Sequence, residues 1–209
     1  MSSSHRVTIV DIGLSNTWSV LNAFQYLGAG TEVTSDVKSV LSADVIVLPG
    51  VGSYRQAMER LQESRLGEAI TTGSRDNGRK ILGICLGMQL LARSGTEDGV
   101  TAGLGIIQAD VAPFTNSEVM GGKIPHVGFN SVRPTGGSLL FDGLPQDPDF
   151  YFVHSFRMMP EGLAGAASLC NYGIDFAAAY EHENIFATQF HPEKSQANGL
   201  QLLKNFLEA

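Results

Sequence analysis

Cys85 lies in a segment whose glycine spacing suits a nucleophilic cysteine. It ends a short apolar run, a helix-forming run from Leu86 to Ala92 begins at once, and Gly83 and Gly87 stand two residues to either side. This layout is typical of a nucleophile elbow, a tight strand-to-helix turn with no room for side chains where the backbone closes. We expect the turn to place Cys85 at a helix N-terminus, where the helix dipole favours a thiolate and a backbone N–H faces a developing oxyanion.

A free cysteine alone is more often a small buried hydrophobe, so a function for Cys85 depends on a base elsewhere. His191 and Glu193 follow another predicted strand, and two residues apart in extended backbone they share a side, so the carboxylate could orient the imidazole. A solvated surface turn is the alternative interpretation. Because Cys85 and His191 both follow the carboxyl ends of predicted strands, we expect them at the edge where ligands bind. Thiolate, imidazole and carboxylate form a complete set for nucleophilic catalysis.

A third motif, Pro49-Gly-Val-Gly52, also follows a predicted strand. Its glycines let backbone N–H groups approach a ligand closely, which suits an oxyanion donor, although an ordinary turn is an equal alternative. The motif is too short for a phosphate loop and lacks the Lys-Ser/Thr pair, so nucleotide binding is disfavoured.

Composition excludes several classes of protein. The 209 residues are 43% apolar and 17% charged, which indicates a globular chain, and we expect one domain spanning 1–209. A net charge of −7 with no basic cluster argues against nucleic-acid binding. No membrane-spanning run and no signal peptide are recognisable, and two cysteines are too few for a disulfide framework, so we expect a cytoplasmic protein. No residue spacing suggests a metal site, no cofactor is predicted, and Cys170 has no nearby base, which favours a structural role.

Alternating strands and helices in the first half predict a parallel sheet, and short connections in the second half predict an antiparallel extension. The expected fold is α/β, with a mixed, mainly parallel central sheet flanked by helices. The predicted strands are Arg6–Asp11, Thr31–Thr34, Asp44–Leu48, Ile81–Ile84, Val100–Ala112, Gly128–Arg133, Phe150–His154, Phe176–Tyr180 and Ile185–Phe190. The predicted helices are one capped by Ser15 or Asn16 and ending near Tyr26, then Val37–Leu41, Tyr54–Thr72, Leu86–Ala92 and Gly199–Leu207.

The three motifs, in this order, resemble those of the class I glutamine amidotransferases. PGVGSY is similar to their oxyanion strand, GICLGMQLL to their cysteine elbow and QFHPEKS to their His-Pro-Glu motif. The resemblance covers essentially the whole chain. It implies glutamine hydrolysis through a γ-glutamyl thioester on Cys85, with His191 as base and acid and Glu193 as its orienter.

The same resemblance implies the groups that contact substrate. Backbone N–H groups of Leu86 and of the Val51–Gly52 segment would stabilise the oxyanion, and the segment from His154 to Phe156 would meet the α-carboxylate end of glutamine. The full set implied to bind substrate or oxyanion is Val51, Gly52, Leu86, Gly87, Gln89, Glu97, Ser155 and Phe156.

A further segment, KIPHVGFN, is similar to Lys-Ile-Pro-His-Met-Gly-Trp-Asn in the glutaminase subunits of imidazole glycerol phosphate synthase, and YFVHSF to their Tyr-Phe-Val-His-Ser-Tyr. In those subunits the first segment lies against a (β/α)8-barrel synthase subunit that receives ammonia and makes imidazole glycerol phosphate and AICAR in histidine biosynthesis. The resemblance therefore implies a heterodimer. From residue types alone the segment is a loop with an anchoring aromatic. The implied interface residues are Lys123, Pro125, His126, Phe129 and Asn130.

Three departures from that pattern leave alternatives open. Phe129 replaces the usual Trp, Phe156 replaces the usual Tyr, and the loop Asp11–Asn16 reads DIGLSN where the family often has Tyr-Gly-x-Gly-Asn. One alternative is a paralogue that supplies ammonia to a related barrel for amidation or amidination of a surface sugar. Another is a stand-alone cysteine hydrolase of small γ-glutamyl compounds. A non-enzymatic binding module is the third, and the intact Cys85 and His191 argue against it.

Overall fold

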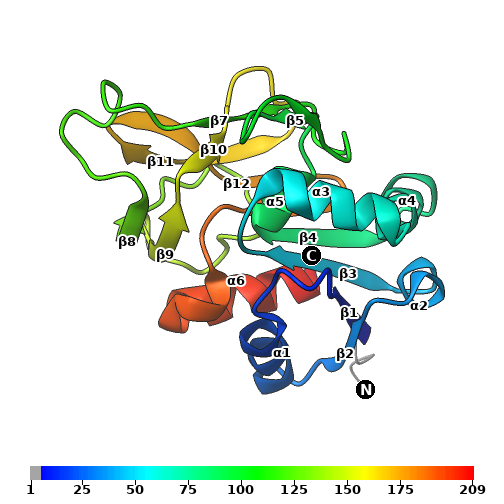
Figure 1. Ribbon diagram of the computed structural model, residues 1–209. Coiled ribbons are helices and arrows are strands. Elements are labelled where there is room, and N and C mark those ends of the chain that lie inside the picture. The colour runs from blue at the N-terminus through cyan, green and yellow to red at the C-terminus, as the bar shows by residue number, and fades with distance from the viewer. Residues whose placement is uncertain (1–5) are drawn as a thin grey trace.

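A seven-stranded sheet forms the centre of the molecule, and the computed structural model describes residues 6–209 (Figure 1). Its strands are β1 (Arg6–Val10), β2 (Gly30–Thr34), β3 (Val45–Gly50), β4 (Lys80–Cys85), β11 (Ala166–Tyr172), β12 (Ile174–His182) and β13 (Ile185–Thr188). Their order is β11-β12-β13-β4-β3-β1-β2. The strands from β13 to β2 run parallel, and β12 and β11 add an antiparallel extension. The predicted fold class is confirmed.

Helices cover both faces of this sheet, because its middle strands are apolar on both sides. Along β3, Val45 and Val47 pack into one core, and Ile46 and Leu48 into the other. The first core is covered by α1 (Thr17–Tyr26) and α6 (Gln196–Glu208). The second is covered by α2 (Val37–Leu41), α3 (Tyr54–Glu63), α4 (Leu66–Thr71) and α5 (Leu86–Leu90). Figure 1 shows these two helical layers on opposite sides of the sheet.

Two small sheets stand beside the central one. The first has the order β10-β7-β5-β6, and the second is the antiparallel pair β8-β9. Their strands are β5 (Ser94–Gly95), β6 (Thr101–Ala102), β7 (Asp110–Pro113), β8 (His126–Ser131), β9 (Asp149–His154) and β10 (Phe156–Met158).

The second-half strand predictions need correction here. The predicted strand 100–112 is wrong over most of its length, because the chain turns between β6 and β7. A Cβ at Gly103 would lie 2.2 Å from the Ala92 carbonyl oxygen, and Gly105 has a φ of +64°. The strand predicted at 128–133 belongs to β8, outside the central sheet. Strands β5, β10 and β11 were not predicted. In β11, Tyr172 is the single residue of a type enriched in strands.

Helix boundaries follow local chemistry. Asn16 caps α1 as predicted, because its side chain accepts the Ser19 N–H at 3.4 Å. The single helix predicted over 54–72 is wrong: Arg65, with a φ of 62°, separates α3 from α4. A π-helix, Thr72–Asp76, then extends α4. Helix α5 ends two residues earlier than predicted, and α6 begins three residues earlier.

No helix within residues 6–209 combines the length and the apolar character that crossing a membrane requires. That residues 1–209 form one domain stays a prediction. The expectation that no leader peptide is present concerns residues 1–5, which lie outside the described part of the chain.

Candidate active site

Cys85 occupies the strained turn that the glycine spacing predicted. It is the last residue of β4 and has a φ of 55° and a ψ of −112°, which costs a non-glycine residue about 1–3 kcal/mol. The turn is tight because a Cβ at Gly87 would lie 1.7 Å from the Leu48 carbonyl oxygen, and one at Gly83 would lie 2.9 Å from the Gly87 oxygen. Glycine at these positions therefore lets α5 pack directly on the sheet. Since α5 has only five residues, its dipole is weaker than the longer predicted helix would supply.

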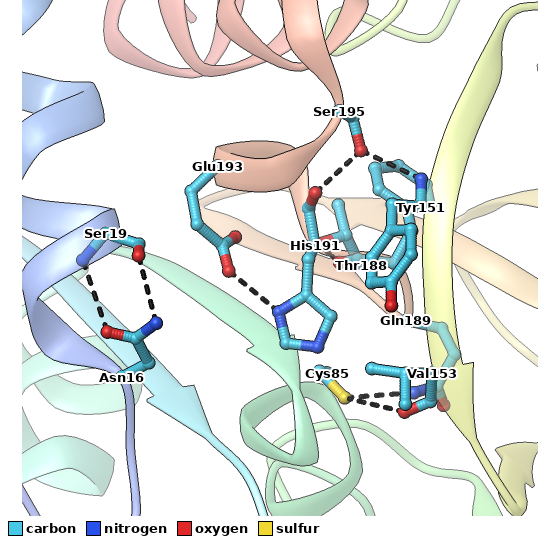
Figure 2. Close-up of polar contacts among 11 residues, drawn as sticks. Asn16, Ser19, Cys85, Tyr151, Val153, Thr188, Gln189, His191, Glu193 and Ser195 are labelled. Carbon is cyan, nitrogen blue, oxygen red and sulfur yellow. Dashed lines mark hydrogen bonds and ion pairs between the residues drawn. The ribbon is translucent and has the colours of Figure 1, made fainter. Parts of the chain in front are cut away.

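His191 lies beside Cys85 and is held from its far side by Glu193. The His191 Nδ1–H donates to Glu193 Oε1 at 2.8 Å, and both side chains are almost completely buried. Figure 2 shows the imidazole between the Glu193 carboxylate and the Cys85 sulphur. The His191 Nε2 is buried and has no hydrogen-bond partner within residues 6–209, so it is free to exchange a proton with Cys85. Glu193 reaches this position from a 3₁₀ turn, Pro192–Lys194, rather than from the extended backbone that the sequence suggested.

The surroundings keep His191 protonated. Burial lowers the pKa of His191, but the polar interaction with Cys85 and the hydrogen bond to Glu193, with the charges of both, raise that pKa to about 10. An imidazolium at neutral pH pairs with a thiolate and can hand a proton to a leaving group.

We expect Cys85→Ala to lower the pKa of His191, because the substitution removes a polar partner and its charge while burial remains. In the wild-type protein the stabilisation from protonated His191 is complete below pH 6.5 and is lost as the pH rises towards 10. NMR titration of the imidazole checks the shift, and urea unfolding at both ends of this window checks the loss. A His191 titration that is identical in the variant and the wild type would contradict the interaction with Cys85.

The backbone of His191 is fixed by residues that the sequence analysis did not single out. The Ser195 hydroxyl donates to the His191 carbonyl oxygen at 2.6 Å and accepts the Tyr151 N–H at 2.9 Å (Figure 2). The His191 N–H in turn donates to the Tyr151 carbonyl oxygen at 2.9 Å. Ser195 is buried, and its position two residues after Glu193 was the available signal in the sequence.

A cavity of about 350 Å³ opens over Cys85. All but one of the residues predicted to bind substrate or oxyanion line it. Its lining is Val51, Gly52, Cys85, Leu86, Gln89, Glu97, Pro125, Val153, His154, Ser155 and Phe156. Gly87 is the exception: it is buried against β3 rather than at the cavity wall, which gives it a steric role, and its contact with ligand stays a prediction.

Two polar side chains of this lining are already partly engaged. The Gln89 Nε2 donates to the Phe156 carbonyl oxygen and to the Gln189 Oε1, both at 2.9 Å, which uses both of its N–H groups. The Glu97 Oε2 accepts the Tyr54 N–H at 2.6 Å and so caps α3. Both residues therefore offer oxygen acceptors, rather than donors, to a molecule in the cavity.

The Val51 N–H, which the sequence analysis expected as an oxyanion donor, is engaged elsewhere. It donates to the Leu14 carbonyl oxygen at 2.8 Å. Leu14 belongs to the loop between β1 and α1, the loop whose sequence departs from the family pattern. In this conformation the expected donor role of Val51 is not met. The Leu86 N–H begins α5 and has no intrahelical acceptor.

The residues predicted at a partner interface separate into two groups. Phe129 is 51% exposed and packs edge-on against Tyr151, with ring centroids 5.6 Å apart, and Lys123 is also exposed. His126 is buried on β8 and stacks on Tyr172 at 4.0 Å, so the expectation that it lies in a loop is wrong, and its place in a partner interface stays a prediction. Alternation along β8 explains this, since neighbouring residues point to opposite faces. Asn130 is half-buried and faces inward with His126, and exposed Pro125 reaches the cavity.

The described part of the chain holds neither a second reactive cysteine nor a metal site. Cys170 is buried and free, and burial, followed by the charge of Asp175, raises its pKa to about 12. No group of three or more His, Cys, Asp or Glu side chains within residues 6–209 is arranged to hold a metal ion.

The chain belongs to the class-I glutamine amidotransferase family, whose family model matches residues 8–209. Among curated proteins it is similar to imidazole glycerol phosphate synthase subunit HisH of Geobacter sulfurreducens, with 43% identity over 97% of this chain and 98% of the relative. The HisH subunit of Yersinia pseudotuberculosis is 44% identical over 97% of this chain and 98% of its own length. The family and the enzyme class predicted from the sequence are confirmed.

Solved structures agree on the fold. PurLQS of Thermotoga maritima matches with a TM-score of 0.73 at 14% identity, over 98% of each chain. The glutaminase domain of Trypanosoma brucei CTPS with bound acivicin matches with a TM-score of 0.67 at 18% identity, over 98% of this chain and 94% of that one. At these identities the likeness concerns the fold alone.

Proposed function

We propose that this chain is the glutaminase subunit of imidazole glycerol phosphate synthase, which releases ammonia from L-glutamine for a (β/α)8-barrel synthase subunit in histidine biosynthesis. One observation carries the chemistry: an imidazole held by Glu193 faces the Cys85 sulphur at the floor of a cavity. Similarity to HisH subunits over almost the whole chain supports the pathway.

In the proposed reaction the Cys85 thiolate attacks the δ-amide carbon of glutamine. The carbonyl oxygen gains the negative charge, and backbone N–H groups of Leu86 and of the Val51–Gly52 segment stabilise it. The C–N bond then breaks, His191 gives its proton to the departing ammonia, and a γ-glutamyl thioester remains on Cys85. His191 next takes a proton from water as the water attacks the thioester, and glutamate leaves.

The cavity suits the other end of the substrate. Gln89 has only its carbonyl oxygen left to offer, and Glu97 keeps one carboxylate oxygen beyond the one that caps α3. Two oxygen acceptors complement the α-ammonium group of glutamine. Ser155 and Phe156 also line the cavity, and their backbone is proposed to meet the α-carboxylate end.

The isolated chain is proposed to be a poor glutaminase. An N–H that donates to Leu14 cannot also donate to an oxyanion, so Val51 must leave that hydrogen bond before it can contribute. Loss of one oxyanion donor costs about 10²–10³-fold in turnover. Docking of the partner subunit is the proposed trigger for this change.

The proposed docking face is the exposed side of β8, which presents Val127 and Phe129, together with exposed Lys123 from the segment before β8. Val127 and Phe129 pair with Val153 and Tyr151 of β9. The Val153 carbonyl oxygen lies 4.0 Å from the Cys85 sulphur, so β9 contacts both the docking face and the nucleophile. The predicted cytoplasmic location stays a prediction.

Ammonia release from glutamine, measured with and without the co-expressed barrel subunit, tests the proposal. We expect turnover to rise on the order of 10²-fold in the complex. Phe129→Ala should weaken that stimulation, whereas Tyr26→Ala, an exposed aromatic at the far end of α1, should leave it intact. High turnover without a partner would favour the stand-alone hydrolase instead. An aminated product other than imidazole glycerol phosphate would favour the paralogue.

A further inference from the structure

Gln189 is a fully buried amide that the proposed reaction does not use. It follows β13 and lies next to Cys85, with its Nε2 3.7 Å from the sulphur (Figure 2). Its Oε1 accepts an N–H of Gln89 at 2.9 Å. A buried amide between a second amide and a reactive sulphur has a defined donor direction only if its surroundings impose one.

A backbone carbonyl imposes that direction. The Phe156 oxygen can only accept, so the Gln89 atom 2.9 Å away from it must be the amide nitrogen. The second N–H of Gln89 then meets Gln189, which must present its oxygen there. The remaining atom of the Gln189 amide is therefore nitrogen, and it faces Cys85. The orientation of the Gln189 amide is therefore set by the hydrogen bonds that join it through Gln89 to Phe156, and not by the sulphur.

A buried histidine holds the same carbonyl in place, and a second one fixes the first. The His154 Nδ1–H donates to the Phe156 oxygen at 2.8 Å, so the His154 Nε2 must accept, and it does so from His126 at 3.0 Å. Burial lowers the pKa of His126 to about 4 and that of His154 to about 3. Both rings are thus neutral at working pH, and the donor directions of this network do not change there.

We propose that Gln189 is a positioning residue whose amide, oriented by Gln89, donates a hydrogen bond to the Cys85 sulphur and holds the thiolate for attack. The proposal rests on the proposed role of Cys85 as nucleophile. Hydrogen bonds to a charged acceptor are stronger than those to a neutral one, so this donor favours the thiolate over the thiol.

The test is the pH profile of Cys85 alkylation by iodoacetamide, in which the thiolate forms a C–S bond and iodide leaves. Other groups that face Cys85 or its cavity are His191 with Glu193, Glu97 and neutral His154. Gln189→Met keeps the length of the side chain and removes the donor. We expect the alkylation midpoint to rise by about one pH unit. In the complex with the barrel subunit, kcat should fall about tenfold while KM for glutamine changes little.

Gln189→Glu directs a carboxylate oxygen at the sulphur and should raise the midpoint further. Gln201→Met is the matched control, because Gln201 is half-buried on α6 and bonds only Asn205 among the described side-chain contacts. Peptide mapping separates Cys85 from Cys170. Should neither Gln189 variant fold, NMR of the wild-type protein still tests the proposal. The chemical shifts of the Gln189 side-chain amide protons should change as the thiolate forms.

The positioning role would be overturned if Gln189→Met had the alkylation midpoint and kcat of the wild type. It would also be overturned if the Gln189 amide chemical shifts did not change when Cys85 ionises. Either result leaves the nucleophile untouched as long as Cys85→Ala is inactive. If Cys85→Ala keeps its turnover, the proposed function fails instead, so the two failures are distinguishable.

Discussion

Replacing Cys85 by alanine or serine should reduce glutamine turnover in the complex by at least about 10³-fold. The reason is that the covalent route through a thioester disappears, and neither a methyl group nor a hydroxyl replaces a thiolate at neutral pH. The fold should persist, since Cys85 is held by packing around β4 and α5 that either side chain preserves. Ammonia release at saturating glutamine measures the effect.

Cys170→Ala is the matched control for this experiment. Cys170 is buried on β11, and its thiol is not ionised at neutral pH because burial raises its pKa to about 12. The control variant should therefore keep its turnover. Substantial activity in Cys85→Ala would contradict the mechanism. A loss of activity only in Cys170→Ala, and not in Cys85→Ala, would show that Cys85 is not the nucleophile.

Replacing Gly87 by alanine should destabilise the protein by about 3 kcal/mol or more. The added Cβ would lie 1.7 Å from the Leu48 carbonyl oxygen and 2.8 Å from its carbon, so the backbone of the elbow or of β3 must move. That movement also displaces Cys85, so turnover should fall with stability. Urea unfolding measures the free energy of unfolding.

The matched control is Gly136→Ala, at an exposed position where an added Cβ meets nothing within 4 Å. Its free energy of unfolding should change by less than about 0.5 kcal/mol. Equal stability of the Gly87 and Gly136 variants would contradict the steric account of the elbow.

Sequence reasoning located the central sheet because its strands carry a strong local signal. The nearly continuous apolar runs of β3 and β4 are typical of strands covered on both faces, and the glycines around Cys85 are required by a turn that can be recognised locally. Local patterns were less informative between β5 and β8. There, two-residue strands are held by tertiary pairing that the sequence does not display.

The site was predicted as a set of side chains but not as a network. The pairing of His191 with Glu193 follows from two positions close in sequence, whereas the hydrogen bond from Val51 to Leu14 joins two backbones and leaves no side-chain signature. His126 illustrates a different limit. Alternation shows which residues of β8 share a face, but only packing against Tyr172 decides which face is buried.

The most direct test of the central claim is labelling of the complex with an electrophilic glutamine analogue, followed by peptide mapping. The account predicts one adduct, on the Cys85 sulphur, and protection of that sulphur by excess glutamine. It also predicts no adduct in Cys85→Ala. An adduct on another residue, or an unmodified Cys85 in a complex that still releases ammonia, would contradict the account.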